Sequence, residues 1–275
     1  MKINRIKHAF SKVKDSGRKA ALIPYITVGD PSVNITVPLM HALVNSGADI
    51  IELGIPFSDP MADGPIIQRS SERAISRNIG IIDVLNLVEK FRINDNETPV
   101  VLMGYENPIE CIGQENFVNL AKKSGIDGVL VVDSPPEESV YFSELLKKNN
   151  MHQIFLLSPT STEDRIRYIS KIASGYIYYV SLKGVTGSGS LNVNDVNKRL
   201  EIIRKYVQIP VGVGFGVKDS ETAKKIAVSA DAIVIGSRII ELMEQAFNDA
   251  NDIEKDACAI EAAVNFISTI SNELR

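Results

Sequence analysis

The sequence predicts an α/β fold, a (β/α)8 TIM barrel in which eight parallel strands alternate with helices. Eight short apolar runs rich in Val and Ile recur along the 275 residues, and most lack the alternation of a strand with one solvated face. A helical pattern follows each run, and no linker rich in Pro, Gly or Ser interrupts the series. Eight such units in about 250 residues fit a closed barrel.

We therefore expect a single (β/α)8 domain over residues 1–275, with an N-terminal helix and extra short helices. The alternative is an open doubly wound sheet, which a Gly-rich fingerprint after the first strand would favour. The turn at that place reads VGDPS instead. The expected strands cover residues 21–28, 49–55, 100–105, 128–133, 153–157, 176–181, 210–215 and 232–235.

Amphipathic patterns between these runs predict the helices. Residues 136–148 open with Pro-Glu-Glu and residues 162–173 with Thr-Glu-Asp, which suit a helix start because acidic residues complement the helix dipole. A further helix begins near Pro65. The other helices are expected at residues 33–46, 82–91, 116–124, 194–206, 218–229, 238–250 and 253–270.

Composition narrows the class of protein. The net charge of −4 offers no field for nucleic acid, and no apolar run reaches the ~20 residues of a membrane span. Cys111 and Cys258 stand far apart and read as free thiols in a reducing compartment, so we expect a cytoplasmic protein. The three histidines are scattered, so no metal site is expected.

The first twenty residues are basic and poor in acidic residues, as in an organelle transit peptide. Ile3, Ile6, Phe10 and Val13 recur at helical spacing, however. We favour a short amphipathic helix that packs on the first strand.

The second expected strand, within IIELGIPFSDPMADGP, carries a carboxylate in an apolar run. Alternation places Ile50, Glu52 and Gly54 on one face, and glycine on that face leaves room for a ligand in the barrel lumen. A carboxylate there is poorly solvated, so its pKa should rise towards neutrality, as a proton shuttle requires. The alternative is a strand-end acid that pairs with Lys or Arg or lies in solvent.

Asp63 follows eleven residues later in a loop that Pro56 and Pro60 restrict. It is a candidate for a second catalytic group or for the acceptor of a ligand N–H. The alternative is an N-cap for the helix that starts near Pro65.

Three glycine-bearing turns come late in the chain: GVTGSG at 184–189, GFG at 214–216 and Gly236-Ser237. Glycines let backbone N–H groups approach an anion, and the loops after the seventh and eighth strands are the usual phosphate site of this barrel. The sequence therefore predicts a phosphate ligand. Arg238 either assists the anion or points outward.

Tyr176 and Tyr178 share one face of the sixth strand, and Tyr179 takes the other. A tyrosine in a parallel strand is usually core, but Tyr178 would rise on the lumen side within reach of a ligand. The segment 100–103 and Leu130 would supply apolar walls for an aromatic ring.

These motifs resemble the tryptophan synthase alpha-subunit family. The resemblance rests on IELGIPFSDPMADGP with IIQRSSERAI, PYITVGDP, LMGYENP, VVDSPPEE, YYVSLKGVTG, GVGFGV and VIGSRI, and it runs from about Arg5 to about Ile270. It implies a (β/α)8 barrel that cleaves indole-3-glycerol phosphate by a retro-aldol reaction into indole and glyceraldehyde 3-phosphate. It also implies a β-subunit partner in an α2β2 tetramer, with PLP in the partner and no cofactor in this chain.

The resemblance assigns roles to particular residues. It implies Glu52 as the main acid/base, Asp63 as the acceptor for the indole N–H, and Tyr178 beside Glu52. The phosphate-binding positions it implies are Gly187, Gly216, Gly236 and Ser237. The substrate-pocket positions are Tyr25, Ile67, Met103, Tyr105, Leu130, Phe215 and Thr186.

The chain departs from the family pattern at four positions: Met61, Ser134, Lys183 and Arg238. Arg238 stands beside the expected phosphate turn, where the family often has a small residue. Three rival readings are a stand-alone lyase of the same fold, a non-catalytic regulatory barrel, and another phosphate-binding barrel such as a sugar-phosphate isomerase. Intact Glu52 and Asp63 argue against the second.

Overall fold

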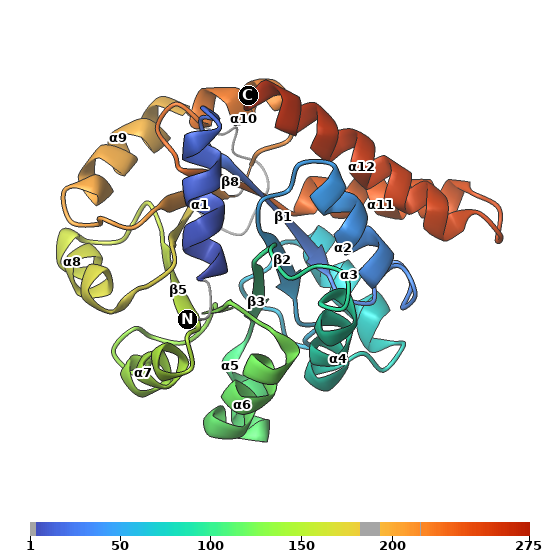
Figure 1. Cartoon of the computed structure of the whole chain (residues 1–275), viewed down its shortest axis with the longest axis horizontal. Helices are drawn as coiled ribbons and strands as arrows, with labels where there is room; N and C mark the ends of the chain where they lie inside the picture. The colour runs from blue at the N-terminus through green and yellow to red at the C-terminus, as the bar shows by residue number, and fades with distance from the viewer. Residues whose placement is uncertain (1–3, 182–192, 215) are drawn as a thin grey trace.

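The computed structural model describes residues 4–181, 193–214 and 216–275 and shows a closed barrel of eight parallel strands (Figure 1). Each strand pairs with the next, and the first closes the ring against the last. The predicted fold class is confirmed, and an open sheet is excluded. The strands are β1 (Ala21–Thr27), β2 (Ile51–Gly54), β3 (Val100–Gly104), β4 (Gly128–Val131), β5 (His152–Leu157), β6 (Ile177–Val180), β7 (Val211–Gly214) and β8 (Ala232–Ile235).

Helices surround the barrel on its outside (Figure 1). Those of the described residues are α1 (Arg5–Asp15), α2 (Thr36–Asn45), α3 (Pro65–Ile75), α4 (Ile81–Phe91), α5 (Glu106–Ile112), α6 (Gln114–Ser124), α7 (Val140–Lys148), α8 (Glu163–Ile172), α9 (Val193–Arg204), α10 (Ser220–Ile226), α11 (Ser237–Asp249) and α12 (Lys255–Glu273). None of these helices combines the length and the apolar composition that a bilayer span requires.

The sequence predicted the start of one helix correctly and that of another wrongly. Thr162 caps α8, because its side chain accepts a hydrogen bond from the N–H of Arg165. The start expected at residue 136 is wrong: the N–H of Ser139 bonds the carbonyl of Pro135 at 3.1 Å, which closes a turn before α7 begins at Val140. Helix α5 is one of the extra short helices and had no separate signal in the sequence.

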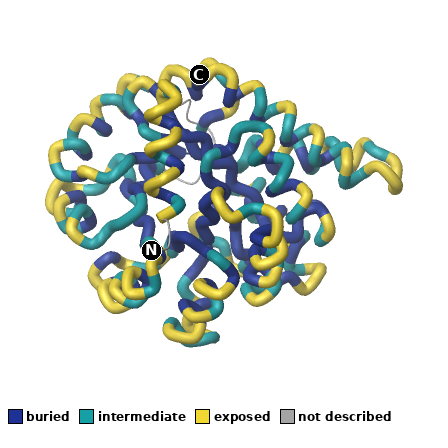
Figure 2. Tube along the Cα trace, viewed as in Figure 1, coloured by how far each residue is buried: buried dark blue, intermediate teal, exposed yellow. Residues whose placement is uncertain are grey.

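The predicted alternation along β2 is observed. Ile50 packs with lumen side chains, whereas Ile51 and Leu53 pack with the shell between strands and helices. Buried residues therefore follow the strands and the inward sides of the helices (Figure 2). The same rule corrects one expectation: Val100 and Leu102 face the shell, so they cannot line a lumen pocket.

Helix α1 closes the N-terminal end of the barrel and lies across it in Figure 1. Its buried side chains, Ile6, Ala9 and Val13, join the lumen cluster instead of packing on the first strand alone. Ligands must therefore enter from the other end, where the strands finish. Ile3, the first residue of the predicted pattern, lies outside the described residues.

Candidate active site

Glu52 lies in the lumen on β2, in register with Tyr25 of β1 and Val101 of β3. It is fully buried, and neither carboxylate oxygen has a hydrogen-bond partner among the described residues. Burial raises the pKa of Glu52 from 4.5 to about 8, because ionisation would place an unpaired charge away from water. Among the described residues, Glu52 forms no ion pair with Lys or Arg, so the alternative of a paired strand-end acid is not observed. At neutral pH this carboxyl group therefore holds a proton.

Asp63 ends the loop between β2 and α3 and is 4% exposed. Its Oδ2 accepts a hydrogen bond of 2.8 Å from the hydroxyl of Tyr105, whereas Oδ1 is buried without a partner among the described residues. Burial raises the pKa of Asp63 to about 6, and the Tyr105 hydrogen bond opposes that rise. Asp63 is not an N-cap: Gly64 occupies that position of α3, with no side-chain bond. One carboxylate oxygen thus remains available to a ligand N–H.

Tyr105 is itself held in place from two directions. Its hydroxyl accepts a hydrogen bond of 3.1 Å from the N–H of Ala62, and its ring stacks on Phe57 with centroids 4.9 Å apart. Tyr105, which the sequence analysis assigned only to the substrate pocket, therefore positions the Asp63 carboxylate.

Two lumen tyrosines use the space that glycines leave. A Cβ on Gly54 would lie 2.1 Å from the hydroxyl oxygen of Tyr25, and a Cβ on Gly214 would lie 2.1 Å from that of Tyr178. Gly54 therefore makes room for a tyrosine, and the expectation that it leaves space for a ligand is corrected.

The same tyrosines share an electrostatic environment with both carboxylates. Burial, and then the charges of Glu52, Tyr25 and Asp63, raise the pKa of Tyr178 well above its usual value. Burial, followed by Asp63, does the same for Tyr25. The structure thus gathers Glu52, Asp63 and two protonated phenols in one buried region.

The apolar wall of this region is formed by Tyr25, Ile67 and Ile240, with Met103 packed against them. Leu130 is fully buried with the lumen side chains and lies in register with Met103. Ile240 has no motif of its own in the sequence. Its position in the first turn after Gly236 is the signal that could have found it.

At the expected phosphate site, Gly236 occupies the N-cap of α11 and Ser237 its first turn, with no side-chain cap bond. The free N–H groups of a helix N-terminus favour an anion. Gly216 has a φ of +81°, which favours glycine. Arg238 forms an ion pair with Glu241 on the same helix, so it is engaged away from the turn. Thr186, Gly187 and Phe215 lie outside the described residues.

Arg73 links three segments of this rim. Its guanidinium donates to both oxygens of Asp30, at 2.6 and 2.9 Å, and also to Glu244 of α11. Asp30 follows β1 and is 3% exposed, so its charge depends on this pair. The helix that follows Asp63 is thereby tied to the helix that begins at Ser237.

A family model described as tryptophan synthase alpha chain matches residues 10–268. The chain belongs to the tryptophan synthase alpha chain family. The tryptophan synthase alpha chain of Bordetella bronchiseptica is 58% identical over 267 residues, which are 97% of this chain and 94% of the relative.

Solved structures agree with this family. Tryptophan synthase subunit alpha from Legionella pneumophila aligns with a TM-score of 0.90 and 41% identity, and the match covers 99% of this chain and 98% of the other. A chain of the tryptophan synthase complex from Pyrococcus furiosus aligns with a TM-score of 0.79 and 31% identity, covering 92% and 98%. The second structure places a chain with this fold in an assembly.

Proposed function

We propose that this chain is a lyase subunit of tryptophan biosynthesis that cleaves indole-3-glycerol phosphate into indole and glyceraldehyde 3-phosphate. The observation that carries the proposal is Glu52, a fully buried carboxyl group whose pKa is about 8, in one region with Asp63. Membership of the tryptophan synthase alpha chain family supports the same reaction. In this proposal the chain acts as one domain.

The reaction breaks the bond between indole C3 and the glycerol chain. The protonated Glu52 gives its proton to C3, and the indole nitrogen then carries positive charge. Glu52, now ionised, takes the proton of the hydroxyl on the adjacent carbon as the C–C bond breaks and the aldehyde forms. The carboxyl group is protonated again at the end, so a group that titrates near neutrality serves both steps.

Asp63 stabilises the intermediate through its free Oδ1, which accepts the indole N–H while the ring carries positive charge. Tyr105 holds Oδ2 and favours the ionised carboxylate. Tyr178 stays protonated beside Glu52. The indole ring would lie against Tyr25, Ile67 and Met103, and we assign Leu130 to the deeper side of this wall.

The phosphate of the substrate would bind at Gly216, Gly236 and Ser237. The N-terminus of α11 supplies uncapped N–H groups and the positive end of the helix dipole. We extend the assignment by family resemblance to Gly187 for the phosphate, and to Thr186 and Phe215 for the pocket.

We propose a tryptophan synthase β subunit as partner in an α2β2 tetramer in the cytoplasm. Residues 57–61 support this, because they adjoin Asp63 at the rim and Met61 is 77% exposed. The Pyrococcus furiosus structure is titled as a tryptophan synthase complex. The partner's PLP would supply the chemistry that consumes indole.

The test is the lyase rate of wild type and Glu52→Gln with indole-3-glycerol phosphate, with and without a β subunit. We expect the variant to lose about 10³-fold in kcat, within the range for a general acid/base. Glyceraldehyde 3-phosphate should still raise its Tm, which shows that it folds and binds. If the variant keeps a tenth of the wild-type kcat, Glu52 is not the general acid/base of the reaction. Full wild-type activity without the β subunit would favour a stand-alone lyase.

A further inference from the structure

The closed end of the barrel carries a recurring arrangement of three groups. Asp49, just before β2, accepts hydrogen bonds of 2.8 Å from the N–H of Leu22 and from Arg18, and its own N–H donates to the Leu22 carbonyl. The same arrangement recurs before two other even-numbered strands, with Asp127, Val100 and Arg92 before β4 and with Asp231, Val211 and Arg204 before β8. Each aspartate joins two strands and pairs with at least one arginine.

The fourth even-numbered strand, β6, is preceded by the same backbone hydrogen bond, but no aspartate stands there. Before β6 the N–H of Ser174 donates to the carbonyl of Gln153 at 3.2 Å, as the aspartate N–H does at the other three places. A cation is still present, because Lys147 stands at the end of α7, six residues before Gln153. Arg92 and Arg204 stand eight and seven residues before their strand partners.

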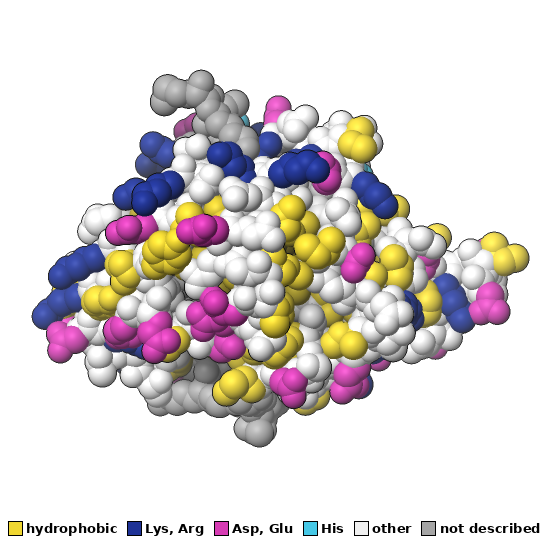
Figure 3. All heavy atoms as spheres, turned by 90° about the horizontal axis from the view of Figure 1, so that it is seen from below, with side chains coloured by type: hydrophobic (Ala, Val, Ile, Leu, Met, Phe, Trp, Pro, Cys, Tyr) yellow, Lys and Arg dark blue, Asp and Glu magenta, His cyan; other side chains and the backbone are white. Residues whose placement is uncertain are grey.

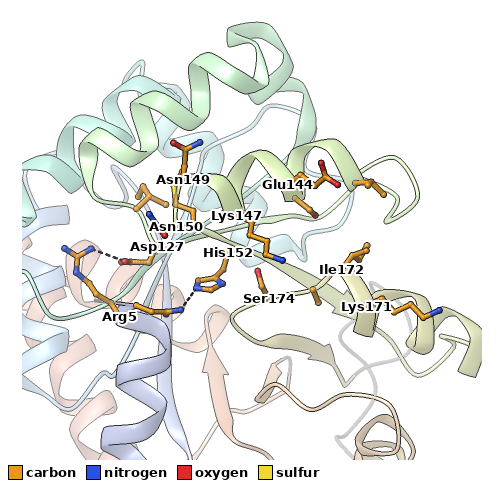
Figure 4. A pocket seen from close by; sticks show the side chains of 16 residues that line it. Arg5, Asp127, Glu144, Lys147, Asn149, Asn150, His152, Lys171, Ile172 and Ser174 are labelled. Carbon is orange, nitrogen blue, oxygen red and sulfur yellow. Dashed lines mark hydrogen bonds and ion pairs between the residues drawn. The ribbon is translucent and has the colours of Figure 1, made fainter. Parts of the chain in front are cut away.

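A cavity of about 440 Å³ lies at this fourth place (Figure 4). Its lining residues include Lys147, Ser174 and Lys171. Lys171 lies in the last turn of α8. In Figure 4 the Lys147 side chain extends towards Ser174, whereas that of Lys171 extends away from both. Within the described part of the chain, the two ammonium groups and the Ser174 hydroxyl form no hydrogen bond or ion pair.

The other charges that line the cavity do not neutralise both lysines. Asp127 pairs with Arg5 at 3.0 Å and also with Arg92 of the arrangement before β4, so it does not neutralise either lysine. Glu144 supplies one negative charge against the two lysines, and burial lowers the pKa of His152, so that ring is neutral at pH 7. The lining therefore carries a net charge of +1.

The direction of the helices explains why cations gather here, but the helix ends do not supply a full counter-charge. Most basic side chains of the face in Figure 3 lie in its upper part, and the acidic ones lie mainly in its middle and lower parts. Lysines in the last turns of α6, α7 and α8 complement the negative ends of those helices. A helix end carries about half a charge, shared over its carbonyls, and it cannot replace a carboxylate.

We propose that this cavity binds a small carboxylate anion, which takes the place of the missing aspartate between Lys147 and Ser174, with Lys171 at the rim of the cavity. The Lys147 ammonium group supplies charge and hydrogen bonds, the Ser174 hydroxyl donates one more, and Lys171 adds positive charge at the rim. The volume is within the range of small-molecule sites, so the anion can carry a body larger than the carboxylate itself. The site lies at the closed end of the barrel, away from Glu52, and does not depend on the lyase reaction.

The test uses acetate as probe and sodium chloride at equal ionic strength as control. Acetate is titrated to about 100 mM, because so small an anion binds with a Kd in the millimolar range. Saturation should raise the Tm of wild type by roughly 3 °C above the chloride control. Saturating glyceraldehyde 3-phosphate is included throughout, so that anion binding at the α11 turn does not contribute.

Ser174→Asp is the deciding variant, because it supplies the carboxylate from the chain. We expect its Tm without acetate to exceed that of wild type by roughly 2 °C, and acetate to give no further rise. Ser174→Asn, of equal size without charge, should still respond to acetate, and Lys147→Met should lose the response. Lyase activity should be unchanged in all three. An equal acetate response in wild type and Ser174→Asp, or no response of wild type beyond chloride, overturns the proposal.

Discussion

The hydroxyl of Tyr105 donates a 2.8 Å hydrogen bond to one oxygen of Asp63 and leaves the other oxygen without a partner in the described chain. The bond does two things at once. It fixes the direction of the free oxygen, and it opposes the effect of burial, so that the pKa of Asp63 rises only to about 6. The balance keeps most Asp63 ionised at pH 7 in a region where burial favours the neutral form.

Tyr105→Phe should therefore weaken catalysis in a pH-dependent way. Loss of a hydrogen bond to a charged group costs about 1.5–3 kcal/mol, so we expect kcat to fall roughly tenfold or more at pH 7. The pKa of Asp63 should rise, and the acidic limb of the kcat profile should move up by about one pH unit. The measurement is kcat against pH for both proteins.

Tyr141→Phe is the matched control, because that hydroxyl donates to Glu115 on the surface at 2.6 Å, away from the rim. It should leave the pH profile unchanged. An acidic limb of Tyr105→Phe that coincides with wild type would show that Tyr105 does not govern the ionisation of Asp63.

Glu52 should make the folded protein less stable as pH rises. Its folded pKa of about 8 lies above the ordinary pKa of 4.5, so between these values the folded state holds a proton that the unfolded state has lost. Stability contributed by this group is present below pH 4.5 and is lost progressively up to about pH 8. Glu52→Gln cannot ionise, so its free energy of unfolding should fall less over that range.

Urea unfolding at pH 5 and pH 8 measures this difference. We expect Glu52→Gln to gain on the order of 2–4 kcal/mol relative to wild type between the two pH values, below the full linkage limit because the buried region relaxes. Parallel pH dependences of the two proteins would mean that Glu52 is ionised in the folded state at neutrality.

Local pattern was enough for the fold and for the faces of the strands. The apolar runs without alternation predicted a buried parallel barrel, and the period of two placed Glu52 and Tyr178 in the lumen. Val100 and Leu102 were misplaced because the run of four was treated as one wall, although alternation sends every second residue to the shell.

The contacts between segments could not be read from local sequence. Asp63 looked like a possible N-cap because the competing partner, Tyr105, lies 42 residues later. Gly54 looked like ligand space because nothing near it in sequence indicates that Tyr25 of the adjacent strand fills the gap. Ile240 was missed for the same reason, since its contact with Ile67 depends on how α11 packs on α3.

Gly54→Ala tests the fit between β2 and Tyr25. The new Cβ would lie 2.1 Å from the Tyr25 hydroxyl oxygen and 2.6 Å from the adjacent ring carbon, so the ring must move. Overpacking costs about 1–3 kcal/mol, and we expect kcat/KM to fall at least tenfold because Tyr25 lines the pocket. Gly64→Ala is the control, since a Cβ there meets nothing within 4 Å. Equal kinetics in the two variants would mean that the Tyr25 position is irrelevant to catalysis.

Glu244→Gln tests whether Arg73 keeps the two halves of the rim in register. The change removes the charge that Arg73 meets on α11 and leaves both Asp30 bonds in place, so the buried carboxylate stays paired. A partly exposed pair is worth roughly 0.5–1 kcal/mol, which predicts a two- to fivefold fall in kcat/KM as the α11 turn loosens relative to Asp63. Glu273→Gln makes the same chemical change in the exposed pair with Lys224 and should leave the kinetics unchanged. If both variants match wild type in kcat/KM but only Glu244→Gln lowers Tm, Arg73 stabilises the fold without positioning the site.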